Sequence, residues 1–248
     1  VDQNFGLYDE MKKYVDDNFE KAKKYCESLS KRIEKEIKDK LVPKEKKDII
    51  LSVGVLTLTG REHFLNRLMN KFKSIIGENA HRVEIVISHD NKEKTVGEKR
   101  NEVLQKAEGK YICFVDDDDM VSDNYFNWII QILDEHSDAD GVGFKGIYYQ
   151  SGNPVMEFSH SSGHQGHFKI QDPDGKIIQQ RPLNHLNPVR ADIVKQIGFP
   201  EKSFGEDSDY CDKLYESNLL KKEIFLDKIL YHYLYDPTTS QTQNGTIG

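Results

Sequence analysis

The chain has few cysteines and no long apolar run. Its 248 residues include three cysteines, Cys26, Cys113 and Cys211, which are far apart and odd in number. This pattern does not predict a disulfide framework, and the apolar surroundings of each thiol favour reduced cysteines in a cytoplasmic protein. No apolar segment approaches the length that a membrane span requires, so we expect none. The chain starts with Val1 and has no signal-like segment, which leaves open that it is a fragment of something longer.

Positive charge is also in deficit. The chain has 35 Lys and Arg residues against 42 Asp and Glu residues, a net charge of −7. Broad nucleic-acid binding needs a basic surface that displaces counterions from phosphates, so we expect no nucleic-acid partner. A charged fraction of 31% and a mean hydropathy of −0.69 describe a soluble protein. The length fits one large α/β domain, or a domain of about 200 residues with an appendage.

The first 47 residues predict a helical extension. Apolar residues recur at steps of about 3.7 positions, close to the period of an α-helix; they are Met11, Val15, Phe19, Ala22, Cys26, Leu29, Ile33 and Ile37. The spacing favours a helix packed on a globular body or in a short helical pair over a sustained coiled coil. We therefore place a boundary near Pro43, with 1–47 as the extension and 48–248 as the main domain. The helix could also serve a homo-oligomer.

Strand-like and helix-like segments alternate after this boundary. The strands are predicted at 49–58, 83–88, 111–115 and 141–149, and the helices at 62–76, 94–107, 127–135 and 192–197. Alternation of this kind favours right-handed βαβ units and a mostly parallel sheet flanked by helices. Ligands of such sheets bind beyond the carboxyl ends of the strands. We therefore expect one crevice to collect the polar residues that follow the strands.

The most informative of these strand ends carries four consecutive carboxylates, Asp116 to Asp119, after the apolar run Tyr111 to Val115. Carboxylates so close together repel one another unless a cation lies among them. Hard oxygen ligands favour Mg²⁺, Mn²⁺ or Ca²⁺, and Mg²⁺-type ions are commonly shared with substrate phosphates. The alternative is an acidic turn that caps a helix starting near Ser122 or Asp123.

A second acidic group, Gly205-Glu206-Asp207, opens a predicted helix that runs through Leu214. These carboxylates could simply cap the helix. They could equally provide a general base, since a helix N-terminus keeps a carboxylate ionised, as a base requires. The motif alone does not decide between the two.

The segment 150–188 is rich in Gly, Pro, Ser and His and has little periodicity. It predicts irregular strands and loops, suited to an insert that recognises a specific substrate. His160, His164 and His167 suggest a metal site by spacing alone. No Cys lies nearby and no clear helix places them on one face, so a zinc site is the weaker interpretation.

In order and spacing, several short motifs together resemble a GT-A-fold glycosyltransferase of the family-2, inverting type. They are Thr57-Leu58-Thr59-Gly60-Arg61, Ile87-Ser88-His89-Asp90, Gly97-Glu98-Lys99-Arg100-Asn101, Ala107-Glu108-Gly109-Lys110-Tyr111-Ile112, the Asp116 to Asp119 quartet and Gly205-Glu206-Asp207. The resemblance covers about 48–240. It implies a Rossmann-like GT-A domain with a nucleotide-binding half at about 48–120 and an acceptor half at about 121–240. It also implies a nucleotide-sugar donor, with a UDP-sugar favoured, a Mn²⁺ or Mg²⁺ ion, and a glycan or other hydroxyl acceptor.

The resemblance also implies roles for single residues. The residues that it assigns to nucleotide binding are Thr57, Thr59, Arg61, Asp90, Arg100, Asp116 and Asp117. The DxD pattern makes Asp118 the first metal ligand, and a late histidine, His232, fits the second. Asp207 matches the general base, and Glu206 is expected to bind the acceptor. A packed strand histidine is nearly as good an interpretation of His232.

Three alternatives remain open from the sequence. A haloacid-dehalogenase-type phosphatase also begins with an apolar strand ending in Asp-x-Asp, but Met120 stands where that class has Thr or Val. A sugar nucleotidyltransferase has a longer Gly-rich basic loop than Thr59-Gly60-Arg61. A noncatalytic module that retains the nucleotide-sugar site differs from an enzyme only in turnover.

Overall fold

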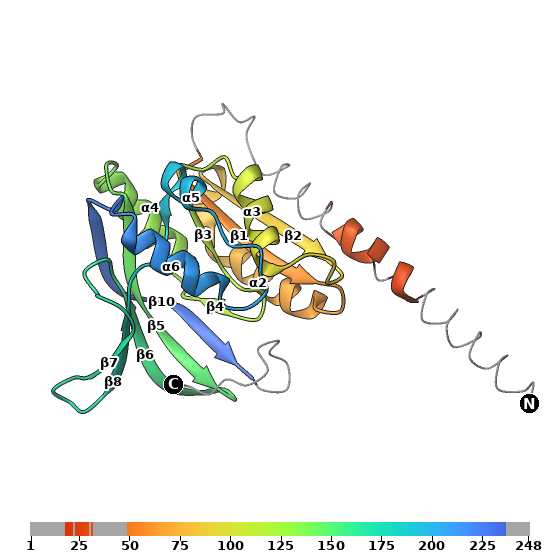
Figure 1. The fold of residues 1–248 in the computed structure, drawn as a ribbon. Helices are drawn as coiled ribbons and strands as arrows, with labels where there is room; N and C mark the ends of the chain where they lie inside the picture. Colours follow the sequence, from red (N-terminus) through yellow and green to blue (C-terminus); the bar gives the residue numbers. More distant parts are fainter. Residues whose placement is uncertain (1–17, 22, 30, 32–48, 237–248) are drawn as a thin grey trace, which may run out of the picture.

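The computed structural model describes residues 18–21, 23–29, 31 and 49–236 (Figure 1). Its labelled elements are β1 (Leu51–Leu58), α2 (Glu62–Ile75), η1 (Gly77–His81), β2 (Val83–Asp90), α3 (Val96–Lys106), β3 (Tyr111–Phe114), β4 (Met120–Val121), α4 (Tyr125–Glu135), β5 (Gly141–Gln150), β6 (Asn153–His160), β7 (Phe168–Gln171), β8 (Ile177–Arg181), β9 (Val189–Arg190), α5 (Ala191–Ile197), α6 (Glu206–Glu216) and β10 (Glu223–Tyr235).

The amino-terminal half is a parallel sheet covered on both faces. Strand β1 lies between β2 and β3 and is parallel to both, with Leu51 opposite Val83 on one side and Tyr111 on the other. Helices α2 and α4 contribute to one apolar core, and α3, α5 and α6 contribute to a second. Burial on both faces explains the continuous apolar sequences of β1 and β3.

The second half of the sheet is mixed. Strand β9 runs antiparallel to both β3 and β5, and so joins the two halves. Strand β5 pairs in parallel with the long β10 and antiparallel with β6. Beyond β6 the sheet continues through β8 to β7, and the segment carrying these two strands projects from the body in Figure 1. The predicted fold class, a Rossmann-like sheet flanked by helices, is confirmed, and the strands β6 to β8 fall within the stretch expected to be irregular.

The helical extension is described only in part. Residues 18–21, 23–29 and 31 are helical, and the remainder of the helix predicted within 1–47 lies outside the described residues, as does the boundary near Pro43. Cys26 and Leu29 are buried, and Leu29 belongs to the same core as α2. The Cys26 thiol donates a hydrogen bond to Glu62 Oε1 at 2.9 Å. This part of the extension therefore packs on its own chain, at the start of α2.

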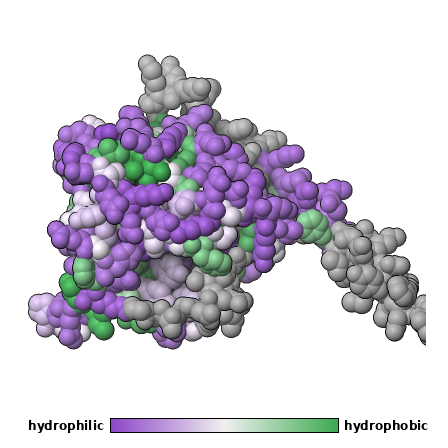
Figure 2. All heavy atoms as spheres, in the orientation of Figure 1, coloured by the Kyte–Doolittle hydropathy of each residue, from purple (hydrophilic) through white to green (hydrophobic). Residues whose placement is uncertain are grey.

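The surface agrees with the charged composition. Figure 2 shows hydrophilic residues over most of the visible face, with hydrophobic residues in separate small groups. Among the described helices, none has both the length and the apolar character needed to cross a membrane.

Candidate functional site

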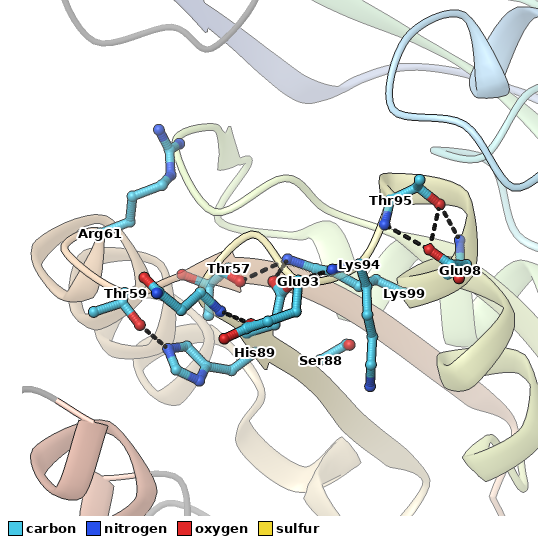
Figure 3. A network of polar contacts seen from close by, with 12 residues as sticks. Thr57, Thr59, Arg61, Ser88, His89, Glu93, Lys94, Thr95, Glu98 and Lys99 are labelled. Atoms are coloured by element: carbon cyan, nitrogen blue, oxygen red, sulfur yellow. Dashed lines mark hydrogen bonds and ion pairs between the residues drawn. The ribbon is translucent and has the colours of Figure 1, made fainter. Parts of the chain in front are cut away.

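The carboxyl ends of β1, β2 and β3 meet, as the parallel arrangement requires. Thr57, at the end of β1, is buried and donates a hydrogen bond to Asp117 Oδ2 at 2.7 Å. Its neighbour Thr59 lies 3.4 Å from His89 Nε2 at the end of β2 (Figure 3). The structure therefore brings Thr57, Thr59 and the acidic quartet to one edge of the sheet.

Arg61 joins the first loop to the quartet. Its NH2 group lies 2.6 Å from Asp117 Oδ1 and 2.7 Å from Asp118 Oδ2, and in Figure 3 its side chain points away from Thr59 and His89. Burial acts to lower the pKa of Arg61, but the hydrogen bond and charge of Asp117, together with Asp118, raise that pKa overall. The predicted nucleotide-binding residues Arg61 and Asp117 are thus in direct contact.

The four carboxylates of the quartet divide into two buried and two accessible ones. Asp117 and Asp119 are 4% and 2% exposed, whereas the side chains of Asp116 and Asp118 are 32% and 25% exposed. Asp119 accepts hydrogen bonds from the Tyr231 hydroxyl at 2.6 Å and from Leu234 N at 2.7 Å. Asp119 therefore ties the loop to β10, which leaves Asp116 and Asp118 as the carboxylates that a ligand can reach.

The accessible pair fits a hard divalent cation. Burial and the neighbouring charges of Asp116 and Asp117 raise the pKa of Asp118, although Arg61 opposes the shift. Arg61 pairs with one oxygen of Asp118, and the crowding of carboxylates around it favours a further cation. Carboxylate oxygens are the ligands that Mg²⁺ and Mn²⁺ prefer.

The predicted second metal ligand lies elsewhere. His232 is opposite Met120 on β4, its ring lies 5.7 Å from that of Tyr149, and its pKa is lowered by burial and by Lys71. Its neighbour Tyr231 points toward the quartet, and adjacent residues of a strand point to opposite faces. The structure therefore does not bring His232 together with Asp118, because the alternation of β10 turns it away.

Asp90 is engaged in a buried ion pair that the sequence did not suggest. Lys99 Nζ lies 2.7 Å from Asp90 Oδ1 and donates a second hydrogen bond to Thr57 O at 2.8 Å. The other oxygen, Asp90 Oδ2, accepts from Lys94 N at 2.9 Å (Figure 3). The contact of Asp90 with a nucleobase stays a prediction. Lys99 could have been suspected, since it immediately precedes Arg100 in the same motif.

The capping box of α3 places Lys99 and Arg100 at this edge. Thr95 Oγ1 accepts from Glu98 N at 3.2 Å and Glu98 Oε2 accepts from Thr95 N at 2.7 Å (Figure 3), which fixes the first turn. Arg100 follows within the next turn and is only 3% exposed. Its guanidinium carbon lies 4.9 Å from the centre of the Phe114 ring, a cation–π distance.

Arg100 connects the quartet to the second acidic motif. Its NH2 group lies 3.4 Å from Asp116 Oδ1 and its Nε 3.3 Å from Glu206 Oε1, while no hydrogen-bond partner for NH1 exists among the described residues. The two acidic motifs, separated by about 90 positions in the sequence, therefore flank one guanidinium. Its unpaired NH1 is a buried donor.

The loop before α6 is docked onto α3. Asn101 exchanges two hydrogen bonds of 2.9 Å with the backbone of Phe199, and Gly97 N donates to Lys202 O at 3.0 Å. A Cβ atom on Gly97 would lie 1.8 Å from Pro200 O, so only glycine allows this approach. Gly205, at the N-cap of α6, has a φ of +72°, which glycine also favours.

Glu206 and Asp207 occupy different environments. Glu206 is 5% exposed and paired with Arg100, whereas the Asp207 side chain is 30% exposed and lies 3.9 Å from Arg181 NH2. Burial acts to raise the pKa of Asp207, but the charges of His185, Arg181 and Arg100 lower it overall. Asp207 is therefore the more accessible carboxylate of the two, and its lowered pKa keeps it ionised.

The three histidines of the middle segment do not form one site. His160 is buried with Nδ1 3.0 Å from Asn187 Oδ1, and His164 Nε2 lies 3.2 Å from Ser159. His167 lies near Cys211 and Asp212, with ligand atoms within 4.8 Å of one another. Arg181 also interacts with the Cys211 thiol, and its positive charge disfavours a cation there.

Comparison with known proteins agrees with this geometry. A family model described as glycosyl transferase family 2 matches residues 69–194, just over half of the chain. The minor teichoic acid biosynthesis protein GgaB of Bacillus subtilis (strain 168) is 26% identical over 144 residues, which cover 56% of this chain and 15% of GgaB. The poly(ribitol-phosphate) beta-N-acetylglucosaminyltransferase TarS of Staphylococcus aureus (strain MW2) is 29% identical over 143 residues, which cover 55% of this chain and 23% of TarS. The chain thus spans less than a quarter of the length of either curated relative.

Solved structures share the fold. The crystal structure of S. aureus TarS 1–349 in complex with UDP-GlcNAc superimposes with a TM-score of 0.54 at 20% identity, covering 75% of this chain and 59% of that one. The complex of the same protein with UDP gives the same TM-score at 21% identity, covering 76% and 61%.

Proposed function

Because the chain belongs to glycosyl transferase family 2, we propose that it transfers a sugar from a nucleotide-sugar donor to an acceptor hydroxyl with inversion at the anomeric carbon. The observation that carries this proposal is the position of Arg100 between Asp116 and Glu206. It brings a carboxylate of the acidic quartet and one of the base-bearing motif to the same buried guanidinium. A displacement reaction needs the groups that act on the leaving group and on the attacking group within one site.

The donor binds at the carboxyl ends of β1 to β3. Thr59 and Arg61 contact the nucleoside there, the buried Thr57 and Asp117 hold Arg61 in place, and Asp90 meets the base. Arg100 NH1, a buried donor with no partner among the described residues, is available to the diphosphate, on which negative charge develops as the nucleotide leaves. Asp116 lies beside Arg100, toward the ribose and the diphosphate.

Asp118 would hold a Mn²⁺ or Mg²⁺ ion, with Asp116 beside it in the same loop. Bound there, the ion would offset charge on the nucleotide diphosphate. The accessibility of these two carboxylates supports this role. His232 is not included, because its face of β10 turns away from the quartet.

Asp207 acts as the general base. Its carboxylate is accessible and ionised, so it can accept the proton of an attacking hydroxyl held within hydrogen-bonding reach. Direct attack by that hydroxyl needs no covalent enzyme intermediate. Glu206, buried against Arg100, positions that guanidinium and lies on the acceptor side.

The relatives suggest which substrates to try first. The similarity to TarS favours a UDP-sugar, UDP-N-acetylglucosamine among them, and a polyol-phosphate polymer as acceptor. GgaB is named for minor teichoic acid biosynthesis, which supports trying teichoic acids as acceptors. The chain covers only a small part of both relatives, so its acceptor could also be another glycan hydroxyl.

The test is a panel of UDP-, GDP-, TDP- and CMP-sugars with Mn²⁺, scored by thermal shift and by nucleotide release. We expect a UDP-sugar to raise the melting temperature and to be turned over, since a ligand stabilises the state that binds it. Nucleotide-sugar binding with no turnover on any acceptor would point to a noncatalytic module. Absence of binding to every donor would contradict the proposal.

A further inference from the structure

The loop between β8 and β9 contains a buried polar network with one unsatisfied member. Asn184, His185 and Asn187 are 1%, 7% and 1% exposed. Polar side chains buried to this degree almost always have hydrogen-bond partners, and an exception requires an explanation. In the sequence this loop is only an Asn-His-Leu-Asn run in a segment without periodicity.

The two asparagines are satisfied within the fold. Asn187 Oδ1 accepts from Asn184 N at 3.1 Å and contacts His160 Nδ1 at 3.0 Å, while its Nδ2 donates to Val142 O at 3.1 Å. Asn184 Oδ1 accepts from Leu186 N at 3.1 Å. These bonds fix the loop against β5 and β6.

The backbone of His185 is fixed as well, since its carbonyl accepts from Phe114 N at 2.8 Å at the end of β3. Its imidazole is different. Neither Nδ1 nor Nε2 has a hydrogen-bond partner among the described residues. A rigid loop thus holds a buried ring that makes no hydrogen bond to the described residues and whose Nε2 faces the Asp116 carboxylate.

The ring lies at the centre of the proposed site. His185 Nε2 is 3.7 Å from Asp116 Oδ2, too far for a hydrogen bond but close enough for one hydroxyl oxygen to bond both groups. The ring also interacts electrostatically with Asp207, the proposed base. Asp116 is assigned to the donor side of the proposed site, so the imidazole stands beside the bound donor.

We propose that His185 is a sugar-binding residue, whose Nε2 bonds a hydroxyl group of the sugar being transferred, with Asp116 as the second partner of that hydroxyl. This inference rests on the proposed function, since it names a contact within the same site. The transferred sugar must lie next to the diphosphate, and so beside Asp116, where the imidazole is held. A sugar hydroxyl is both donor and acceptor, so it can donate to the Asp116 carboxylate and accept from His185.

The test compares UDP with a UDP-sugar that the wild-type protein binds, in His185→Phe and His185→Asn. The Phe variant fills the space of the ring without hydrogen bonding. We expect UDP affinity to change less than twofold and UDP-sugar affinity to fall about tenfold, the usual effect of losing one hydrogen bond to an uncharged partner. The exposed His81→Phe is the matched control and should change neither affinity. A thermal melt establishes that each variant is folded.

Deoxy-sugar donors give the second readout. Wild type should lose at least about tenfold in affinity for the one deoxy analogue that lacks the contacted hydroxyl, and His185→Phe should lose less with that analogue, because only the bond to Asp116 is left to remove. Unchanged UDP-sugar binding by a folded His185→Phe, or an equal loss for UDP and UDP-sugar, would overturn the inference and leave the proposed function standing. Failure of the wild-type protein to bind any nucleotide sugar would overturn both.

Discussion

Asp118 is an accessible carboxylate crowded by Asp116 and Asp117. We predict that Asp118→Asn abolishes Mn²⁺-dependent nucleotide binding and turnover, because it removes the charge that would hold the ion. The fold should persist, since the change relieves repulsion among the carboxylates. Calorimetric titration of UDP with and without Mn²⁺, together with a thermal melt, measures both effects. Full activity of the wild-type protein in EDTA would contradict the metal site.

Asp207 and Glu206 are adjacent in sequence but differ in environment, and the difference predicts different kinetics. Asp207→Asn keeps the shape and removes the proton acceptor, so the transfer rate should fall by a factor of about 10² to 10⁴ with nearly unchanged donor affinity. Glu206→Gln should mainly weaken donor binding, because Glu206 holds Arg100. Single-turnover rates and donor titrations of both variants separate the two roles. A larger rate loss in Glu206→Gln would reverse the assignment.

His160 is buried and neutral, and its pKa is held well below the ordinary value by burial and by the charge of Arg181. Below pH 6.5 the unfolded chain binds a proton at this position that the folded chain does not. The contribution of His160 to the free energy of unfolding is therefore fully present above pH 6.5. It is lost as the pH falls below that value, by about 1.4 kcal/mol per pH unit.

We predict that His160→Gln reduces the slope of the free energy of unfolding against pH, between pH 6.5 and 5, by about 1.4 kcal/mol per pH unit. The variant should also be less stable than wild type at pH 7.5. Urea unfolding at several pH values measures the difference from wild type. His81→Gln, at an exposed position, should leave the slope unchanged. If the free energies of unfolding of wild type and His160→Gln changed in parallel with pH, this account would be contradicted.

At the scale of elements, the contact between α3 and the loop before α6 builds the site. Gly97→Ala would place a methyl group 1.8 Å from Pro200 O, so one of the two backbones must move. We predict a loss of about 1–3 kcal/mol in the free energy of unfolding, the usual effect of overpacking. The rate of sugar transfer should fall more than the affinity for UDP, because the displaced loop leads into α6, whose first residues are Glu206 and Asp207.

Denaturant unfolding and kinetics of Gly97→Ala test this, with Gly163→Ala as control, since the nearest atom to a Cβ there is 3.5 Å away. A stable, fully active Gly97→Ala would mean that the loop adapts without cost to the site.

The elements differ in how far the sequence could define them. Strand β1, helix α2 and strand β3 were predictable within one or two residues, since their apolar periodicity is strong and local. Residues 150–188 were not, because β6, β7 and β8 depend on pairing with one another and with β5 rather than on their own pattern.

The same contrast holds for the site. Asp116 to Asp118 and Glu206 stand in recognisable motifs, and the structure brings both motifs to Arg100. Lys99 and His185 were missed, because their roles depend on partners far away in sequence. His232 was placed from its position in the chain alone, and the face on which a strand residue lies depends on register, which the sequence did not define.

At the scale of the whole molecule, the open question is whether the helical extension contributes to the site. Cys26 donates to Glu62 Oε1, and the same oxygen accepts from Gly60 N at 2.9 Å, beside Arg61. Within the described residues, the Cys26 side chain thus connects the extension to the donor loop. Every residue placed in the donor site lies after residue 48.

We therefore predict that a chain beginning at Asp48 retains UDP affinity within a few-fold. It should melt about 5 °C lower, because the core loses the cover of Cys26 and Leu29. Sedimentation of both chains measures whether the exposed surface promotes association or whether the extension itself mediates an oligomer. Full-length Cys26→Ala is the matched control, since it removes only the hydrogen bond to Glu62 and should match wild type in UDP affinity. Loss of UDP binding in a truncated chain that still melts cooperatively would mean that the extension helps to build the donor site, and that the boundary near Pro43 does not separate an independent domain.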